Sequence, residues 1–332
     1  MIIKDRDYPI RLRKLEALIN RLYDHNSKLP LIKDDYKGWK SGYKGELNTD
    51  YRLSFLPEKD YWILRDLRLT DDSWKFQIDT LILTRRYFLL IETKNHSGAL
   101  LFEKDSEQMI QTKQDKEKAY DHPVIQVNKQ KWHFNRWLQA NNFKVPLIHT
   151  LVVISNSSTI IKTDDPFLYK YVVKGDVLVD RIMKIDTNHF NEFFQDKDLK
   201  KISKTLVKKH SPFHPDILKI YSLSPADLQK GVQCPSCSYF GMKRMKWIWV
   251  CPHCLLRSKA AHHSAVLDYF LLIKPTMTNQ ELKDFLLLPT SRSSGNLLST
   301  LNLPFSGATK GRVYHMPKDK ETFFHLKSPK KN

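Results

Sequence analysis

Four polar residues interrupt apolar segments in the first hundred residues of the chain. Asp79 breaks one apolar strand-like run, and Glu92 and Lys94 end the next run, while Glu46 lies upstream in a segment of helical character. Because side chains alternate on a strand, Glu92 and Lys94 must point to the same face. A hairpin between the two strands would place Asp79 beside them.

Two carboxylates that are buried close together need a cation to neutralise them. Oxygen ligands with open coordination positions suit Mg²⁺ or Mn²⁺. The ammonium group of Lys94 could then orient a water molecule and stabilise the charge that develops as a phosphodiester bond is cleaved. This pattern of residue types favours metal-assisted hydrolysis of nucleic acid.

A simpler interpretation of the same residues exists. Glu92 and Lys94 would form a solvated pair at a strand end, and Asp79 would be a charge at a strand edge. The position of Glu92 after five apolar residues, with an intrusive aspartate one hairpin upstream, favours the catalytic interpretation.

The elements that must position these residues follow from the hydrophobic pattern. Strands are expected at 61–69, 76–84, 87–94 and 147–154, and helices at 9–25, 42–55, 122–140 and within 175–209. This order predicts a mixed α/β core, and the short link at 84–86 predicts a hairpin.

Four short motifs resemble, in order and spacing, those of the NERD domain, the nuclease-related domain of the PD-(D/E)xK superfamily. The resemblance covers roughly residues 36–155. The motifs are Gly42–Glu46, Gln77–Asp79, Ile91–Lys94 and Val124–Gln126.

The resemblance implies a restriction-endonuclease-like mixed sheet flanked by helices and an active nuclease. It implies that Asp79 and Glu92 ligate Mg²⁺ or Mn²⁺, with the Thr93 carbonyl as a further oxygen ligand. The other catalytic residues that it implies are Glu46, Lys94 and Gln126.

All four cysteines of the chain lie within one short segment. Cys234 and Cys237 form one Cys-x-x-Cys turn, and Cys251 and Cys254 form a second. Two such turns supply the closed set of four thiolates that a structural zinc ion prefers. The residues between them have strand character, so a zinc ribbon is expected at 231–258, as a nucleic-acid contact or as a spacer.

The last seventy residues predict a small separate module. Thr278 and Glu281 have the spacing of a capping box at the start of a helix. A turn is expected at 289–294, a helix at 295–301 and a strand at 311–316. Residues 260–332 thus resemble a winged helix-turn-helix; the alternative is a small helical domain for protein contact.

The charge balance points to a polyanionic partner. The 332 residues carry a formal net charge of +19, with 41% hydrophobic residues. DNA is the expected partner, and RNA is not excluded. The candidate nucleic-acid contacts are Lys129, Arg136, Lys243, Arg244, Lys246, Arg292, Lys310 and Arg312.

The domain prediction places a nuclease-like domain at 1–210, including the first helix, and a linker at 211–230. The charged N-terminal residues do not resemble a signal peptide. We therefore expect a cytoplasmic protein without a membrane partner, and homo-oligomerisation is left open.

Two functions are expected to compete. The first is a metal-dependent nuclease that cleaves DNA, delivered to its substrate by the zinc ribbon and winged helix. Foreign-DNA defence and DNA repair are both compatible with it. The second is a DNA-binding regulator that keeps a nuclease-like scaffold without turnover.

Overall fold

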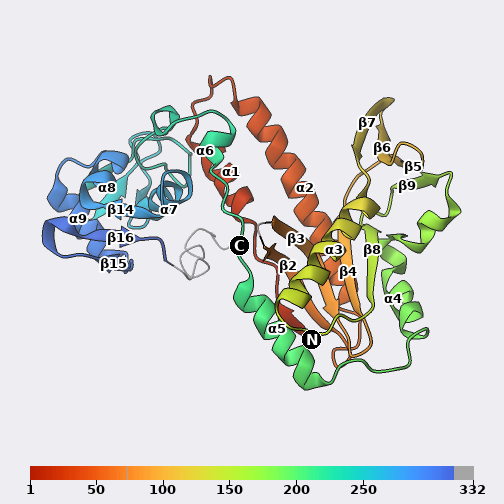
Figure 1. Cartoon of the computed structure of the whole chain (residues 1–332). Coiled ribbons are helices and arrows are strands. Elements are labelled where there is room, and N and C mark those ends of the chain that lie inside the picture. Colours follow the sequence, from red (N-terminus) through yellow and green to blue (C-terminus); the bar gives the residue numbers. More distant parts are fainter. Residues whose placement is uncertain (73, 318–332) are drawn as a thin grey trace. The chain divides into compact units, whose positions relative to one another are not determined.

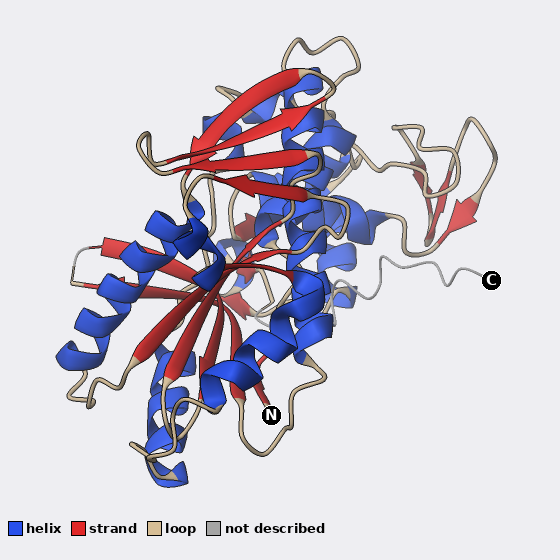
Figure 2. Cartoon of the chain, turned by 90° about the vertical axis from the view of Figure 1, so that its right-hand side faces the viewer, coloured by secondary structure: helices blue, strands red, loops and turns tan. Residues whose placement is uncertain are grey.

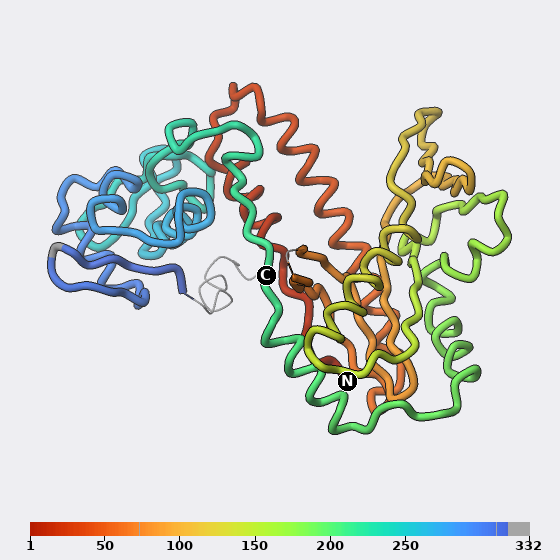
Figure 3. Tube along the Cα trace, in the orientation of Figure 1, coloured from red at the N-terminus to blue at the C-terminus, as the bar shows by residue number. Residues whose placement is uncertain are grey.

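The structure, a computed structural model, describes residues 1–72 and 74–317 and divides into two compact units. Unit 1 consists of Met1–Pro9 and Lys37–Phe213, and unit 2 consists of Ile10–Tyr36 and the chain from His214 onward. The chain therefore leaves unit 1 after Pro9 and later returns to it, which the trace in Figure 3 shows. The sequence analysis assigned the first helix to the nuclease-like domain, whereas this helix packs in unit 2.

A six-stranded mixed sheet forms the centre of unit 1 (Figure 1). Its strands are β1 (Ile2–Lys4), β2 (Trp62–Asp71), β3 (Trp74–Leu83), β4 (Phe88–Lys94), β8 (Ile148–Ile154) and β10 (Val172–Lys174). They lie in the order β1-β2-β3-β4-β8-β10. The strands β2, β3 and β4 are antiparallel neighbours, β8 and β10 continue in parallel from β4, and β1 is parallel to β2.

Helices cover both faces of this sheet (Figure 2). They are the later part of α2 (Leu29–Leu53), α3 (Pro123–Ala140), α4 (Leu178–Asp186) and α5 (Asp196–Lys209). On β4, Phe88 and Leu90 belong to the core that includes α3 and α5, whereas Leu89 and Ile91 belong to the core that includes α2 and α4. Burial on both faces explains why this strand has a continuous apolar sequence.

The predicted hairpin is confirmed, because β3 and β4 pair in antiparallel register from Thr80–Ile91 to Leu83–Phe88. The second helix was predicted to begin at residue 42 and begins at Leu29 instead. Three glycines between residues 38 and 45 lower the intrinsic helical propensity of this segment. Leu29 and Ile32 before this segment and Leu53 after it are buried, so packing at both ends of the helix offsets that cost.

Unit 1 contains a second sheet that the sequence analysis did not predict. Its strands are β5 (Ala99–Glu103), β6 (Gln108–Lys113), β7 (Lys116–Asp121) and β9 (Ile160–Thr163), in the order β7-β6-β5-β9. Five of the six residues of β7 are exposed. A strand with so little buried surface shows no apolar alternation, and therefore its sequence resembles a loop.

Unit 2 combines the first helix with the C-terminal third of the chain. Its helices are α1 (Ile10–Arg21), α6 (Ile217–Ile220), α7 (His262–Leu272), α8 (Asn279–Leu286) and α9 (Ser291–Thr300). Arg21 is buried, pairs with Asp268 at 2.9 Å and lies 4.5 Å from the centre of the Phe285 ring. This ion pair ties α1 to α7 inside the unit.

Unit 2 also contains two small sheets. The first is formed by β11 (Lys243–Met245), β12 (Ile248–Val250) and β13 (Arg257–Ser258), and the second by β14 (Thr276–Thr278), β15 (Phe305–Ser306) and β16 (Val313–His315). Four short 3-10 helices complete the described chain: η1 (Pro166–Lys170), η2 (Gly175–Val177), η3 (Pro225–Asp227) and η4 (Thr309–Gly311).

The capping box predicted at the start of α8 is confirmed. The Thr278 side chain accepts from the Glu281 amide, and the Glu281 carboxylate accepts from the Thr278 amide. The turn predicted at 289–294 is wrong from Ser291 onward, because α9 begins there. The Thr290 hydroxyl accepts from the Ser293 amide at 3.2 Å and so caps a polar helix start. Within the described residues, none of the helices has the length and apolar character needed to cross a bilayer.

Candidate active site and zinc centre

Helix α2 brings Glu46 to the end of β4 through a close approach at Gly45. A Cβ atom on Gly45 would lie 2.4 Å from the Asn95 Cβ and 2.6 Å from the Ser155 Oγ. Such contacts are too short for any other residue without a shift of the backbone. The absence of a side chain at Gly45 therefore sets the distance between the helix and the strand ends.

Asp79 lies where the ladder between β2 and β3 is interrupted. The paired residues on either side are Arg65–Thr80 and Leu67–Ile78, and Asp66 on the opposite strand has a φ of 49°. The Asp79 Oδ2 accepts a hydrogen bond from the Thr93 amide at 2.9 Å. This amide lies beyond the last β3–β4 pair, so the carboxylate replaces a backbone partner and is held at the end of β4.

Glu92 and Lys94 point to the face of the sheet that α3 covers. The Lys94 ammonium donates to Glu92 Oε1 and to Gln126 Oε1, both at 2.8 Å. The buried Gln130 donates from Nε2 to the other carboxylate oxygen of Glu92 at 2.7 Å. Both oxygens of Glu92 are thus engaged, and α3 orients the lysine as well as the carboxylate.

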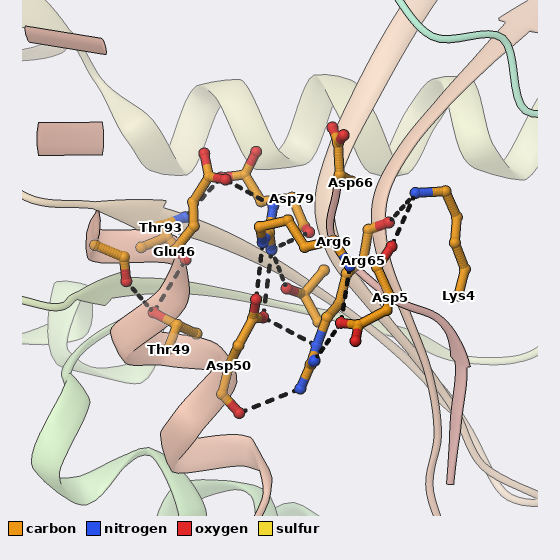
Figure 4. Close-up of polar contacts among 12 residues, drawn as sticks. Lys4, Asp5, Arg6, Glu46, Thr49, Asp50, Arg65, Asp66, Asp79 and Thr93 are labelled. Atoms are coloured by element: carbon orange, nitrogen blue, oxygen red, sulfur yellow. Dashed lines mark hydrogen bonds and ion pairs between the residues drawn. The ribbon is translucent and has the colours of Figure 1, made fainter. Parts of the chain in front are cut away.

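Arg6 reaches into the acidic group from the N-terminal segment (Figure 4). Its side chain is only 2% exposed and pairs with Glu46 at 2.7 Å and with Asp50 at 2.8 Å. It also donates to the Asp79 carbonyl oxygen at 2.8 Å. Arg6 therefore connects α2 to β3 and supplies a positive charge on one side of the carboxylates.

The carboxylates of this group repel one another, and each makes the ionised form of its neighbours less favourable. Burial raises the pKa of Glu46 to about 7, and the carboxylates of Asp66, Asp50 and Glu92 add to the shift although Arg6 opposes it. The pKa of Asp79 is raised well above its usual value by burial, Glu92 and Glu46, against the Thr93 amide and Arg6. The two nearby cations do not balance the site.

The donor set of this site fits a hard divalent cation. Glu46, Asp79 and Glu92 converge from three elements, and the raised pKa values indicate negative charge that lacks compensation. These carboxylates do not form a tight ligand cluster, since among the described residues only the four cysteines form a group of three or more ligand residues whose ligand atoms lie within 4.8 Å. The acidic group therefore has the chemistry, rather than the closed geometry, of a metal site.

The four cysteines form a closed cluster. The Sγ atoms of Cys234 and Cys254 are 3.5 Å apart, and those of Cys237 and Cys251 are 3.6 Å apart. Zinc–sulfur bonds of about 2.3 Å in a tetrahedron place sulfur atoms roughly 3.8 Å apart. The spacing therefore fits zinc and is too long for disulfides, so the predicted four-cysteine zinc-ribbon cluster is confirmed.

The residues predicted to contact nucleic acid on α3 and in the zinc ribbon differ in their exposure and in their partners. Lys129 is exposed, whereas Arg136 pairs with Asp71 at 3.1 Å and with Asp72 at 2.5 Å. In the ribbon, the Arg244 guanidinium is stacked over the buried Trp249 ring, at 5.4 Å. The exposed ribbon lysines are Lys243 and Lys246.

The predicted contacts of the C-terminal module are in part exposed. Arg292 is exposed in the first turn of α9. Arg312 is also exposed, and its guanidinium lies 4.3 Å from the centre of the Phe305 ring. The side chain of Lys310 lies outside the described part of the chain.

Two residues of the acidic site were missed by the sequence analysis. Gln130 follows Gln126 by four residues, and this helical spacing puts both amides on one face of α3, so a signal was available. Arg6 lies 40 residues before Glu46, and nothing in the local sequence links them. Only the packing of the N-terminal segment against β2 brings Arg6 into the site.

Comparison with known families identifies the central part of unit 1. Residues 41–155 match the family described as Nuclease-related domain, NERD. A search of curated proteins and a search of solved structures gave no match. The matched segment contains Glu46, Asp79, Lys94 and Gln126, which the structure brings to one end of the sheet. Residues 41–155 of this protein are thus similar to the nuclease-related domain family, NERD.

Proposed function

We propose that this protein is a divalent-metal-dependent nuclease that hydrolyses DNA phosphodiester bonds. One observation carries the proposal: Lys94 is held between Glu92 and Gln126, and the backbone amide of the preceding residue, Thr93, binds Asp79. An ammonium beside two carboxylates is the arrangement expected of a site that cleaves phosphodiesters. The match to the nuclease-related family supports this assignment.

Asp79, Glu92 and the Thr93 carbonyl would hold the metal ion. The Thr93 carbonyl lies on the edge of β4 beyond the last β3–β4 pair, where the described strands provide no partner. When bound, Mg²⁺ or Mn²⁺ would supply Lewis-acid activation of the phosphate and of a water molecule. The ion would also offset the repulsion from Glu92 and Glu46 that, together with burial, raises the pKa of Asp79.

The protein's own groups would bind and orient the substrate. The Lys94 Nζ would donate hydrogen bonds to a water molecule and to the scissile phosphate, where its charge stabilises the negative charge of the transition state. Gln126 and Glu92 fix the position of that ammonium. Glu46 completes the acidic group from α2, and Arg6 keeps it in place.

Unit 2 would deliver the nuclease to DNA. Its last elements follow the order α7, β14, α8, α9, β15 and β16, with β16 between the other two strands, which is the order of a winged helix. In that arrangement α9 would be the recognition helix, with Arg292 at its exposed start. Arg312 would contact phosphates from the β15–β16 hairpin, and the zinc ribbon adds Lys243 and Lys246.

The test is cleavage of labelled linear and circular DNA by the full-length protein, with added Mg²⁺ or Mn²⁺ and with EDTA. Loss of intact DNA only in the presence of the metal is expected, and an RNA of the same sequence reports substrate choice. The Asp79→Asn variant should be inactive yet folded, as judged by circular dichroism. Metal-independent cleavage, or cleavage by Asp79→Asn, would refute the proposal; DNA binding without cleavage would favour the regulator.

A further inference from the structure

Unit 1 contains a cavity of about 510 Å³ that the nuclease-related residues do not explain. It is lined by β8, α3, α4 and the residues around Tyr171. Cavities of this size accommodate small molecules, whereas a single inorganic anion occupies only a fraction of the volume.

The cavity lies against an unpaired part of the outer edge of β8. The neighbouring strand β10 pairs only with Val152–Ile154, and the Val152 amide donates to the Tyr171 carbonyl at 2.7 Å. Backbone groups alternate along a strand with a period of two. The amide of Thr150 therefore faces the same edge, where the described strands leave it without a ladder partner, and it is available to a ligand.

The charge of the lining has one sign. Lys131, Lys170, Arg181 and Lys184 line the cavity, and none of the lining residues is acidic. Within the described residues, none of these four cations forms an ion pair with a carboxylate. Four like charges around one cavity repel one another, and an anion would relieve that repulsion.

Neither acidic residue of α4 lines the cavity, and Asp180, beside Arg181, is exposed. Asp186, at the end of α4, accepts from Arg86 at 2.9 Å and from the Tyr87 hydroxyl at 2.8 Å, and it does not line the cavity. It is therefore committed to these partners and does not neutralise the cavity.

A histidine adds hydrogen-bonding capacity without adding charge. His149 lines the cavity, and its Nε2 lies 2.9 Å from the Nε2 of His189. Burial lowers the pKa of His149 to about 4, and His189 and Lys131 contribute to the shift. His149 is therefore neutral at pH 7.

We infer that this cavity binds a nucleoside diphosphate or triphosphate. Four cations match the three or four negative charges of such a ligand at neutral pH, and lysine and arginine are the residues that bind phosphates. Leu147 and Tyr171, which are 51% and 42% exposed, offer an apolar surface for a base. A site without this surface would not distinguish a nucleotide from pyrophosphate.

This cavity is distinct from the candidate active site. It lies along residues 147–151, at the start of β8, whereas Lys94 pairs with Ile154 at the other end of that strand. The inference does not depend on nuclease activity, so it can be tested with no divalent metal added.

The experiment is isothermal titration calorimetry on the full-length protein, without added divalent metal. The ligands are ATP, ADP, AMP, pyrophosphate and inorganic phosphate. Saturable binding of ATP and ADP is expected, at least tenfold tighter than that of AMP, pyrophosphate and phosphate. Lys184→Glu should weaken ATP binding at least tenfold. Lys200→Glu, which makes the same charge change at an exposed position of α5 outside the cavity, should change it less than twofold.

Three results would overturn the inference. The first is the absence of saturable ATP binding at millimolar concentration. The second is equal weakening by Lys184→Glu and Lys200→Glu, which would show diffuse electrostatic attraction. The third is a combined result: Lys184→Glu loses duplex DNA binding, and ATP does not compete with DNA. The cavity would then be part of a DNA-binding surface and not a nucleotide site. Lys184 is exposed, and a thermal melt of each variant checks that it is folded.

Discussion

The two candidate metal sites of this protein are built in opposite ways. The cysteine cluster draws all its ligands from 21 consecutive residues, and its sulfur atoms lie within 4.8 Å of one another. The acidic site takes its carboxylates from α2, β3 and β4, and two cationic side chains, Arg6 and Lys94, lie among them. The first is a closed set of ligands, and the second is an open group with unbalanced charge.

This difference matters for function. A closed set of four thiolates leaves no position for a substrate, so its contribution is to hold unit 2 together. The acidic group is not closed by its own ligands, and its Lys94 ammonium is the group that we propose for contact with a phosphate. We therefore propose a stabilising role for the cysteine site and a catalytic role for the acidic site, and each proposal can be tested.

Loss of zinc should have the largest effect, and it should be confined to unit 2. Structural zinc contributes about 10 kcal/mol or more in small zinc domains, and Cys251 is buried in the core of this unit. The Cys251→Ser variant should lose zinc, measured by mass spectrometry, and expose residues 232–317 to proteolysis. Unit 1 should stay protected. Equal protection of unit 2 with and without zinc would contradict the structural assignment.

Removal of the Lys94 ammonium should strongly reduce turnover and leave the fold intact. We expect Lys94→Ala to reduce DNA cleavage by about 100-fold to 1000-fold, the range found when one preorganised charge donor is lost. Initial rates at saturating Mg²⁺ provide the measurement. Lys75→Ala on the exposed part of β3 is the matched control and should retain full activity. Similar losses in both variants would show that general positive charge, and not this ammonium, is required.

The pH dependence of stability should report the unbalanced charge of the acidic site. The pKa of Glu46 is about 7 in the folded protein against 4.5 ordinarily, so the folded state binds more protons between these values. The contribution of Glu46 to the free energy of unfolding is at most about 3 kcal/mol. It is fully present below pH 4.5 and is lost as the pH rises through 7. Without added divalent metal, urea unfolding of unit 1 should therefore show a smaller decline from pH 5 to pH 7.5 in Glu46→Gln than in the wild type. An identical decline in both proteins would contradict this shift.

The close approach of α2 should be sensitive to a single methyl group. Gly45→Ala must push α2 away from Asn95 and Ser155. We expect the free energy of unfolding to fall by about 1–3 kcal/mol and the cleavage activity to be reduced. Gly42→Ala is the control in the same helix, because a Cβ atom there meets nothing within 4 Å. The free energy of unfolding of this control should rise by about 0.5–1 kcal/mol, because alanine has a higher helical propensity than glycine. Thermal unfolding and cleavage assays compare the two, and equal behaviour would exclude a tight contact at Gly45.

The apolar strands and the capped helix were predictable because their signals are local. β4 and β8 are continuous apolar runs, and the Thr278–Glu281 capping box has a fixed spacing. The sheet of β5, β6, β7 and β9 was not predictable, since it has few buried side chains and one of its strands comes from 40 residues further along. The start of α2 was missed because residues 33–44 are mostly exposed, so this stretch shows no helical period of apolar residues.

The sequence by itself determined the zinc cluster, because four ligands in two short turns meet whenever the segment between them forms a hairpin. It also determined that Glu92 and Lys94 share a face, which follows from the period of a strand. Only the tertiary structure decided that Arg6 belongs to the acidic site and that four cations surround an unpaired strand edge. Such groupings depend on segments that are distant in the chain, and their contacts are set by packing rather than by local spacing.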